Sequence, residues 1–315
     1  MGTSARGSTP RRAPLALPVL LLLGAGLGYG LIFALNKVAT VGGIPFLAFV
    51  FWQSLGAGLI LLIVAFFRGR PPRMTWPHLK AYAVTGLMAM AIPVSIFAYV
   101  APKVPSGALG LSLTLIPILT YLFAIVMALE RFDWRRIAGI LLGLIGVLLV
   151  LLPEASLPDR AMAGWILLGY STAIFFAASN ITGARLWPKD SDAVALAAGF
   201  FFAVTVMLLP VMLAGGQWWF FDHGLDAAAG ALIGVTLVMA CFRFAFYEII
   251  RVSGPVFFST FNYIAVLAGV GWGMLFFGER HSPWIWAALV LMMAGVFLVS
   301  RGQRSAAGGW PGPRA

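Results

Sequence analysis

The chain has 315 residues, of which 61% are hydrophobic and 10% are charged, and its mean hydropathy is +0.97. One soluble core cannot hold that much apolar material, so the composition excludes an ordinary soluble domain and predicts a protein embedded in the lipid bilayer. A net charge of +11 could indicate a nucleic-acid partner, but the distribution of the basic residues accounts for it, and we expect no nucleic acid to bind.

Ten continuously apolar runs follow one another along the chain, and each is close to the roughly 20 residues that a membrane helix needs. The strands of a membrane barrel would alternate apolar and polar residues, which these runs do not do. The predicted fold class is therefore an all-α polytopic membrane protein with ten transmembrane helices. The spans are expected at about residues 15–35, 45–67, 79–100, 105–128, 134–152, 163–184, 194–214, 227–250, 254–277 and 284–300.

The segments at the two ends carry little apolar material. Residues 1–14 form a basic tail, and the run that follows continues through Phe33 without the small-residue cleavage site of a signal peptide, so we expect a retained first span. Residues 301–315 are rich in Gly, Pro and Arg and are expected to be disordered. The only cysteine, Cys241, excludes an intrachain disulfide and a cysteine-based metal cluster.

The basic residues are distributed unequally between the two sides of the membrane. If the N-terminus is cytoplasmic, 16 of them lie in the inner segments, and only Lys37, Lys103, Arg160 and Arg280 lie in the outer ones. Short inner loops of membrane proteins carry the excess of Lys and Arg. The bias predicts an even number of spans with both termini in the cytoplasm, and an outer linker at residues 153–162.

Two segments of the chain align without a gap, ALERFDWRRIAGILLGLIGVLLVLL from Ala128 and FFGERHSPWIWAALVLMMAGVFLVS. Glu130 and Arg131 correspond to Glu279 and Arg280, so the chain divides into two five-span repeats, 15–152 and 163–300. Because five is odd, the second repeat must be inverted, an architecture common in secondary transporters. The GxxxG patterns at 24–28, 139–143, 230–234 and 269–273 predict close helix contacts.

Together with a first span that ends LGYGLIFALNKVA, these junctions and the Gly-rich closing spans resemble the EamA-type permeases of the drug/metabolite transporter superfamily. The resemblance covers about residues 15–300. It implies a ten-helix carrier of small metabolites in the inner (plasma) membrane, often an exporter of amino acids or related compounds, in which spans 1, 3, 4, 6, 8 and 9 surround a central cavity. The chain departs from a symmetric pattern because spans 8 and 9 are markedly more polar than spans 3 and 4.

Arg243 is the most unusual residue of the predicted spans, because a guanidinium is never neutral in a protein and this one lies within span 8. Helical side chains lean toward the N-terminus of their helix, which directs Arg243 toward the membrane centre. We therefore favour a role in a central cavity. Snorkelling to the headgroups and an internal pair, for example with Glu248, stay open.

Other polar side chains of the spans complete the candidate cavity, and a guanidinium among aromatic walls favours a small amphipathic metabolite with a carboxylate, an amino acid first of all. The expected cavity residues besides Arg243 are Tyr29, Asn36, Asn180, Tyr247, Ser259, Asn262, Tyr263 and Trp272. Helix-end electrostatics or a gating contact can explain the junction residues, which are Glu130, Arg131, Glu248, Glu279 and Arg280.

The predicted spans contain no set of side chains that is typical of an enzyme active site. All aspartates and histidines are predicted in loops, so we expect no intramembrane catalytic histidine, no metal site and no cofactor. The expected partners are a small-molecule substrate and the lipid bilayer, and the sequence does not decide between a monomer and a homodimer. The alternatives to a metabolite carrier are a multidrug exporter and a membrane-embedded lipid-handling enzyme.

Overall fold

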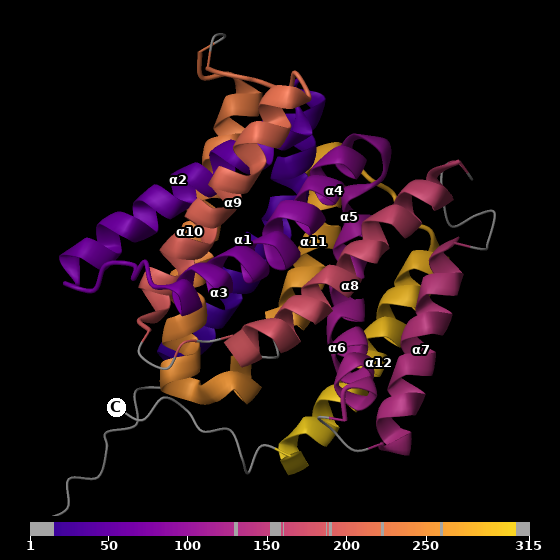
Figure 1. Cartoon of the computed structure of the whole chain (residues 1–315). Coiled ribbons are helices and arrows are strands. Elements are labelled where there is room, and N and C mark those ends of the chain that lie inside the picture. The colour runs from indigo at the N-terminus through magenta and orange to yellow at the C-terminus, as the bar shows by residue number, and fades with distance from the viewer. Residues whose placement is uncertain are drawn as a thin grey trace, which may run out of the picture.

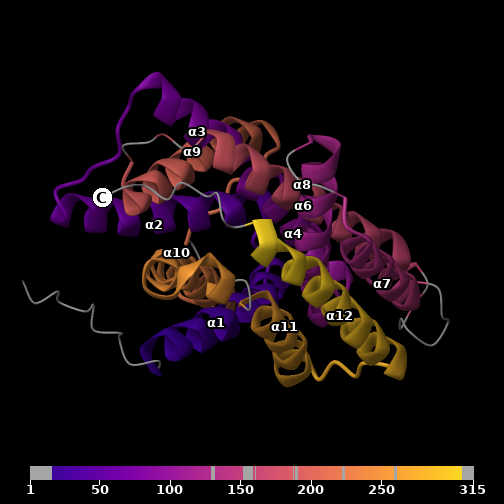
Figure 2. The same ribbon diagram turned by 90° about the horizontal axis from the view of Figure 1, so that it is seen from below.

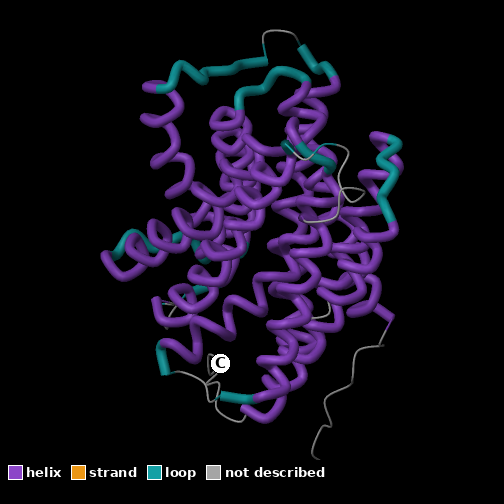
Figure 3. Tube along the Cα trace, turned by 90° about the vertical axis from the view of Figure 1, so that its right-hand side faces the viewer, coloured by secondary structure: helices purple, strands orange, loops and turns teal. Residues whose placement is uncertain are grey.

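The computed structural model describes residues 16–128, 132–151, 159, 161–186, 188, 191–221, 224–258 and 261–306. In this part of the chain all regular secondary structure is helical, as Figure 3 shows. The helices make ten crossing segments (Figure 1), which confirms the predicted fold class. Six of them are long and apolar enough to cross a membrane, and three shorter helices are also apolar.

The first half of the chain contains five crossings, two of which are interrupted by short irregular turns. The elements are α1 (Ala16–Val41), α2 (Phe46–Phe67), α3 (Trp76–Gly86), the π-helical η1 (Leu87–Ala91), α4 (Ile92–Val100), the 3-10 turn η2 (Ala101–Lys103), α5 (Ser106–Gly110), the 3-10 turn η3 (Leu111–Thr114), α6 (Leu115–Val126) and α7 (Trp134–Leu151). Thus α3, η1 and α4 form the third crossing, and α5, η3 and α6 form the fourth.

The second half repeats the plan with uninterrupted helices: α8 (Met162–Leu186), α9 (Ala193–Ala214), α10 (Ala227–Phe258), α11 (Phe261–Phe277) and α12 (Pro283–Ala306). Several boundaries differ from the prediction, and α11 begins at Phe261 where the span was predicted from 254. Helix α1 reaches Val41, because the polar residues near its end are compatible with a helix and the chain turns only at Gly43, where φ is +97°. Helix α10 runs eight residues past the predicted boundary at 250. Residues 301–306, expected to be disordered, continue α12, since their Arg, Gln and Ala residues favour helix.

The helix contacts show the inverted repeat. Helix α2 packs on α9, and α7 packs on α12, which pairs each of these helices with its own counterpart in the other half. Helix α1 packs on α10 and α11, as Figure 2 shows, and its counterpart α8 packs on α4 and α6. Exchange of the two halves therefore maps these main helix contacts onto one another.

Glycines allow the closest of these approaches. A methyl group on Gly295 of α12 would lie 2.6 Å from the Gly139 carbonyl oxygen of α7, and one on Gly30 of α1 would lie 2.6 Å from the Gly269 amide of α11. The 139–143 and 269–273 patterns are thus confirmed as close helix contacts. Gly24 and Gly230 have open space beside them, whereas a methyl group on Gly28 would lie 3.5 Å from Val238 and one on Gly234 would lie 3.3 Å from Leu35, so only the second glycine of these two patterns lies at a helix contact.

The bundle has two end faces. We call upper face the one with the connection between α9 and α10, which is at the top of Figure 1, and lower face the opposite one. The described chain begins and ends on the lower face, which the charge bias predicts to be cytoplasmic. Two apolar clusters fill the bundle, and Tyr29 and Phe176 pack against both of them.

Candidate functional site

A cavity of about 410 Å³ lies between the two apolar clusters. Helices α1, α3, α4, α8, α9 and α10 line it, and aromatic side chains make up much of its wall. Its polar groups are few, which is typical of pockets for small molecules. The main lining residues are Tyr29, Tyr82, Thr85, Phe176, Ser179, Asn180, Phe200, Phe201, Phe242 and Arg243.

Arg243 supplies the cationic group of this lining. It lies 16 residues after Ala227, the upper end of α10, which places it about 24 Å along this 32-residue helix, near the helix midpoint. Its guanidinium carbon is 4.9 Å from the ring centroid of Phe200 and 5.9 Å from that of Phe201. Among the described residues its buried Nε has no hydrogen-bond partner. A buried donor without a partner is costly, so the guanidinium is available to an anion in the cavity.

An aromatic cluster adjoins the guanidinium. The ring centroids of Tyr29 and Phe242 are 4.7 Å apart, and Phe261 lies 5.2 Å from the first and 4.9 Å from the second. Tilted and edge-to-face rings at these distances attract one another, so the wall is rigid and apolar. A ligand that combines an anion with an apolar group fits this surface.

Asn180 and Ser179 add hydrogen-bonding groups from α8. Asn180 donates from Nδ2 to Thr120 Oγ1 of α6 at 3.2 Å, while Ser179 donates to the Phe176 carbonyl at 2.7 Å. The amide oxygen of an asparagine accepts hydrogen bonds and its second N–H can donate one. Asn180 therefore combines helix contact with a lining position.

Two of the predicted cavity residues lie elsewhere. The indole N–H of Trp272 donates to the Leu27 carbonyl at 3.0 Å, which directs this side chain onto α1 and not into the cavity. Asn36 is 3% exposed and lies between the cavity and the upper face, where its Oδ1 lacks a partner among the described residues. Neither residue lines the cavity.

The remaining predicted residues cannot be placed against the cavity. The backbones of Tyr247, Glu248, Asn262 and Tyr263 are helical, but their side chains lie outside the described part of the structure. Outside the described residues altogether are Ser259, Glu130 and Arg131.

The contribution of α9 was missed by sequence reasoning and by the resemblance alike. Phe200 and Phe201 have no distinguishing feature within the predicted seventh span, yet both line the cavity beside Arg243. Tyr82 of α3 was also missed, and its ring lies so close to Gly199 that any side chain there would collide with it. The GFFF run that begins at Gly199, small and then aromatic, is the signal that could have marked this wall.

A second cavity, of about 470 Å³, adjoins the first on the lower face, where Tyr82 and Leu196 form part of the wall of both. It is lined by Arg70, Arg73, His78, Ser191 and Asp192 among others. The hydroxyl of Tyr82 donates to the Arg73 carbonyl at 3.2 Å. The central cavity thus reaches toward the lower face, where a basic vestibule meets it.

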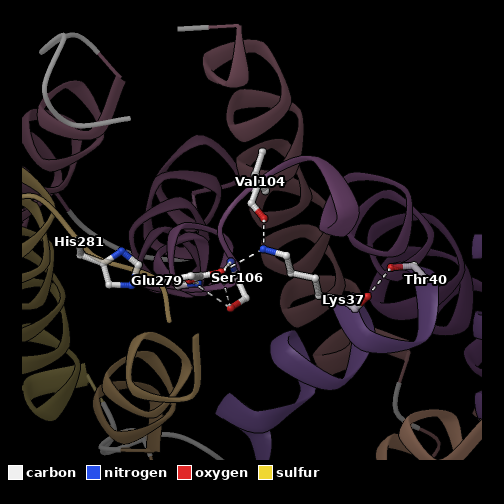
Figure 4. Close-up of polar contacts among 7 residues, drawn as sticks. Lys37, Thr40, Val104, Ser106, Glu279 and His281 are labelled. Carbon is white, nitrogen blue, oxygen red and sulfur yellow. Dashed lines mark hydrogen bonds and ion pairs between the residues drawn. The ribbon is translucent and has the colours of Figure 1, made fainter. Parts of the chain in front are cut away.

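On the upper face the prominent charged group is acidic. The side chain of Glu279 is 9% exposed there and lies in a polar contact (Figure 4). Its carboxylate accepts hydrogen bonds from Lys37 and Ser106. His281 Nε2 is 3.7 Å from Glu279 Oε2, and burial lowers the pKa of His281, although Glu279 and a hydrogen bond to the Val270 backbone oppose this. Arg280 is exposed and belongs to no ion pair in the described structure.

Comparisons with known proteins agree with this architecture. A solved structure described as "Crystal structure of protein" superposes with a TM-score of 0.59 at 19% identity, covering 92% of this chain and 99% of that one, so it shares the fold. No curated protein matches. The EamA-like transporter family matches residues 16–152 and 163–301, one domain in each half. Since transport and not catalysis defines this family, the match also removes the lipid-handling enzyme that the sequence left open. The chain therefore belongs to the EamA-like transporter family of the drug/metabolite transporter superfamily.

Proposed function

We propose that the chain is a secondary transporter that exports small amphipathic carboxylates, amino acids first among them, by alternating access to the central cavity. The observation that carries this proposal is the Arg243 guanidinium, whose buried Nε lacks a partner in the described structure and which lies against the cavity. A guanidinium binds a carboxylate through two parallel hydrogen bonds, a geometry that an ammonium cannot reproduce.

The size and walls of the cavity support a small ligand with an apolar group. A volume of about 410 Å³ lies within the range of roughly 300–1,000 Å³ usual for small-molecule pockets. The carboxylate binds Arg243 in this proposal, while the apolar group contacts Tyr29 and Phe242. Asn180 is available for a second polar group, such as an amine, through its amide oxygen.

Export fits the direction in which the cavity is accessible. The lining includes Gly183 and Pro188 at the lower end of α8, and the vestibule with Arg70 and Arg73 adjoins it there. If the lower face is cytoplasmic, a carboxylate meets positive charge on the cytoplasmic side before it reaches Arg243. Such charges raise the local concentration of an anion and its association rate.

A binding panel on the purified protein in lipid nanodiscs tests the substrate class. The ligands are L-phenylalanine, L-tryptophan and L-leucine, each beside its alcohol analogue, which lacks the carboxylate, together with ethidium as a cationic drug. We expect at least one amino acid to bind saturably. Its alcohol analogue should bind with an affinity that is lower by a factor of roughly 30 or more. Efflux from proteoliposomes loaded with that amino acid then tests the direction of transport.

The panel also separates this proposal from a multidrug exporter. A cationic drug would favour a buried acid, whereas the described lining of the cavity carries an arginine. If ethidium binds while every amino acid binds no better than its alcohol, the carboxylate proposal is wrong and drug export is favoured.

A further inference from the structure

Groups from two crossings, Lys37 of α1 and the first residues of α5, hold Glu279 on the upper face. It follows Gly278, where a φ of +61° turns the chain after α11, and its side chain is only 9% exposed. Lys37 Nζ of α1 donates to Oε1 at 3.1 Å, and the backbone N–H of Ser106 donates to the same oxygen at 2.8 Å. The N–H of Gly107 donates to Oε2 at 3.3 Å, and Ser106 Oγ lies within 3.2 and 3.4 Å of the two oxygens (Figure 4).

The same contacts fix the connection between α4 and α5, residues 101–107, which we call the upper hairpin. Lys37 Nζ donates to the Val104 carbonyl at 3.2 Å, so it ties this hairpin to α1. Glu279 binds the amides of Ser106 and Gly107, so it ties the hairpin to the α11–α12 connection. Two charged side chains thus hold one short segment against both of its neighbours.

This contact is stronger than a surface ion pair. The side chains of Lys37 and Glu279 are 18% and 9% exposed, and the ammonium lies 4.7 Å from the ring centroid of Phe277, so little water screens the charges. The amides of Ser106 and Gly107 belong to the first turn of the helical crossing 106–126. Amides of a first turn have no hydrogen-bond partner within their own helix, and they lie at the positive end of the helix dipole, so they favour a carboxylate.

The backbone leaves the space that this carboxylate occupies. A methyl group on Gly273 of α11 would lie 2.7 Å from Ser106 Oγ and would collide with the Glu279 carboxylate. The central cavity lies below this contact and has its described lining on the lower side of it. The described lining continues toward the lower face through Tyr82 and Leu196, which also line the lower cavity, and includes no residue of the Glu279 contact.

We propose that Glu279 is the latch of an upper gate. While its carboxylate bridges Lys37 and the upper hairpin, the cavity is closed toward the upper face, and release of these bonds lets the hairpin move away. The inference rests on the alternating access proposed above, but it does not depend on which solute is carried.

A distance measurement without any substrate tests the latch. Spin labels at Pro102→Cys and Val41→Cys, both exposed positions, report the separation of the upper hairpin from the end of α1 in a Cys241→Ser background. We expect one short distance in the otherwise unchanged protein. In Glu279→Gln the ratio of open to closed populations should rise roughly 10- to 100-fold, because bonds to a charged acceptor are lost.

Three further variants make the result specific. Lys37→Met should open the gate less than Glu279→Gln, because the carboxylate keeps the amides of Ser106 and Gly107; it also serves if Glu279→Gln does not fold. The swap Lys37→Glu with Glu279→Lys restores opposite charges, yet a lysine cannot accept from those amides, so this protein should stay open. Arg280→Gln, the exposed neighbour, should leave the distance unchanged.

The proposal is overturned if the folded Glu279→Gln and Lys37→Met proteins both keep the short distance, or if Arg280→Gln opens the gate equally. Recovery of the short distance in the charge swap would also overturn it. Opposite charges alone would then close the gate, and the bonds from the Ser106 and Gly107 amides to the carboxylate would not be needed. None of these results affects carboxylate binding at Arg243, which the ligand panel measures separately.

Discussion

Replacement of Arg243 by lysine and by alanine distinguishes a substrate-binding arginine from a structural one. Alanine removes the whole charge-assisted contact with a carboxylate. Such a contact in a partly dry site contributes about 2 to 3 kcal/mol, which corresponds to a roughly 30- to 150-fold loss of affinity. Lysine keeps the charge but loses the second parallel hydrogen bond and the planar contact with Phe200 at 4.9 Å. We expect the lysine variant to lose about 1 to 2 kcal/mol, or roughly 5- to 30-fold.

The assay is equilibrium binding of the best amino acid of the panel to the purified variants, followed by efflux from proteoliposomes. The alcohol analogue should bind the alanine variant about as well as it binds the unchanged protein, because it never used the guanidinium. Arg185→Ala, an exposed arginine at the lower end of α8, is the matched control and should bind normally. If both Arg243 variants bind and transport the amino acid normally, Arg243 is a structural residue and the substrate class must be argued anew.

Three other predictions concern the gate, the backbone and the orientation. Burial lowers the pKa of His281 in the closed state, so His281 should bind a proton when the gate opens. The open fraction in the spin-label experiment should therefore rise as the pH falls below about 6.5, the ordinary pKa of a histidine, and His281→Gln should flatten this dependence. Ala128 has a φ of +53°, which costs an L-residue about 1 kcal/mol or more, so Ala128→Gly should raise the thermal unfolding midpoint. In the Cys241→Ser background, a cysteine at the exposed Leu225 should react with an impermeant maleimide from outside intact cells, and one at the exposed Arg70 should not.

Each of these predictions has an opposing result. An open fraction that falls on acidification would mean that protonated His281 strengthens the bond to Glu279 more than burial opposes it. A lower midpoint for Ala128→Gly would show that flexibility in the unfolded chain outweighs the relieved backbone, and Gly278→Ala, at a φ of +61°, should lower it in any case. Labelling at Arg70 and not at Leu225 would reverse the orientation.

The fold could be predicted because a bilayer constrains a sequence so strongly. Continuous apolar runs indicate helices, and the Glu-Arg junctions at 130 and 279 mark the repeat without any packing information. The exact helix ends were harder, since polar residues such as Asn36 and Lys37 end an apolar run without ending a helix. Only the turn at Gly43 ends α1.

The site was predictable where it depends on charge and unpredictable where it depends on packing. Arg243 stands out in an apolar span, and the structure places it in the lining of the central cavity, while its role in binding stays a prediction. Phe200 and Phe201 do not stand out, because an apolar residue in a span faces lipid, a neighbouring helix or a cavity with the same sequence signature. Trp272 shows the reverse error, since an indole N–H satisfied by the Leu27 carbonyl is indistinguishable in sequence from one that faces a ligand.

The symmetry of the contacts explains how one latch can control access to a cavity whose lining begins at Tyr29, eight residues or about 12 Å along α1 from Lys37. The α2–α9 and α7–α12 contacts map onto themselves when the halves exchange, so they need not break in a change between the two related shapes. The contacts of α1 with α10 and α11 instead exchange with those of α8 with α4 and α6. In this structure the two sets differ. The upper end of α1 is sealed through Lys37 and Glu279, while the lower end of α8 borders the cavity at Asn180 and Gly183. An exchange of the two arrangements would carry the seal to the lower face and open the upper one. The bonds of Glu279 join α1 to the α11–α12 connection, so they belong to the set of contacts that changes in this exchange.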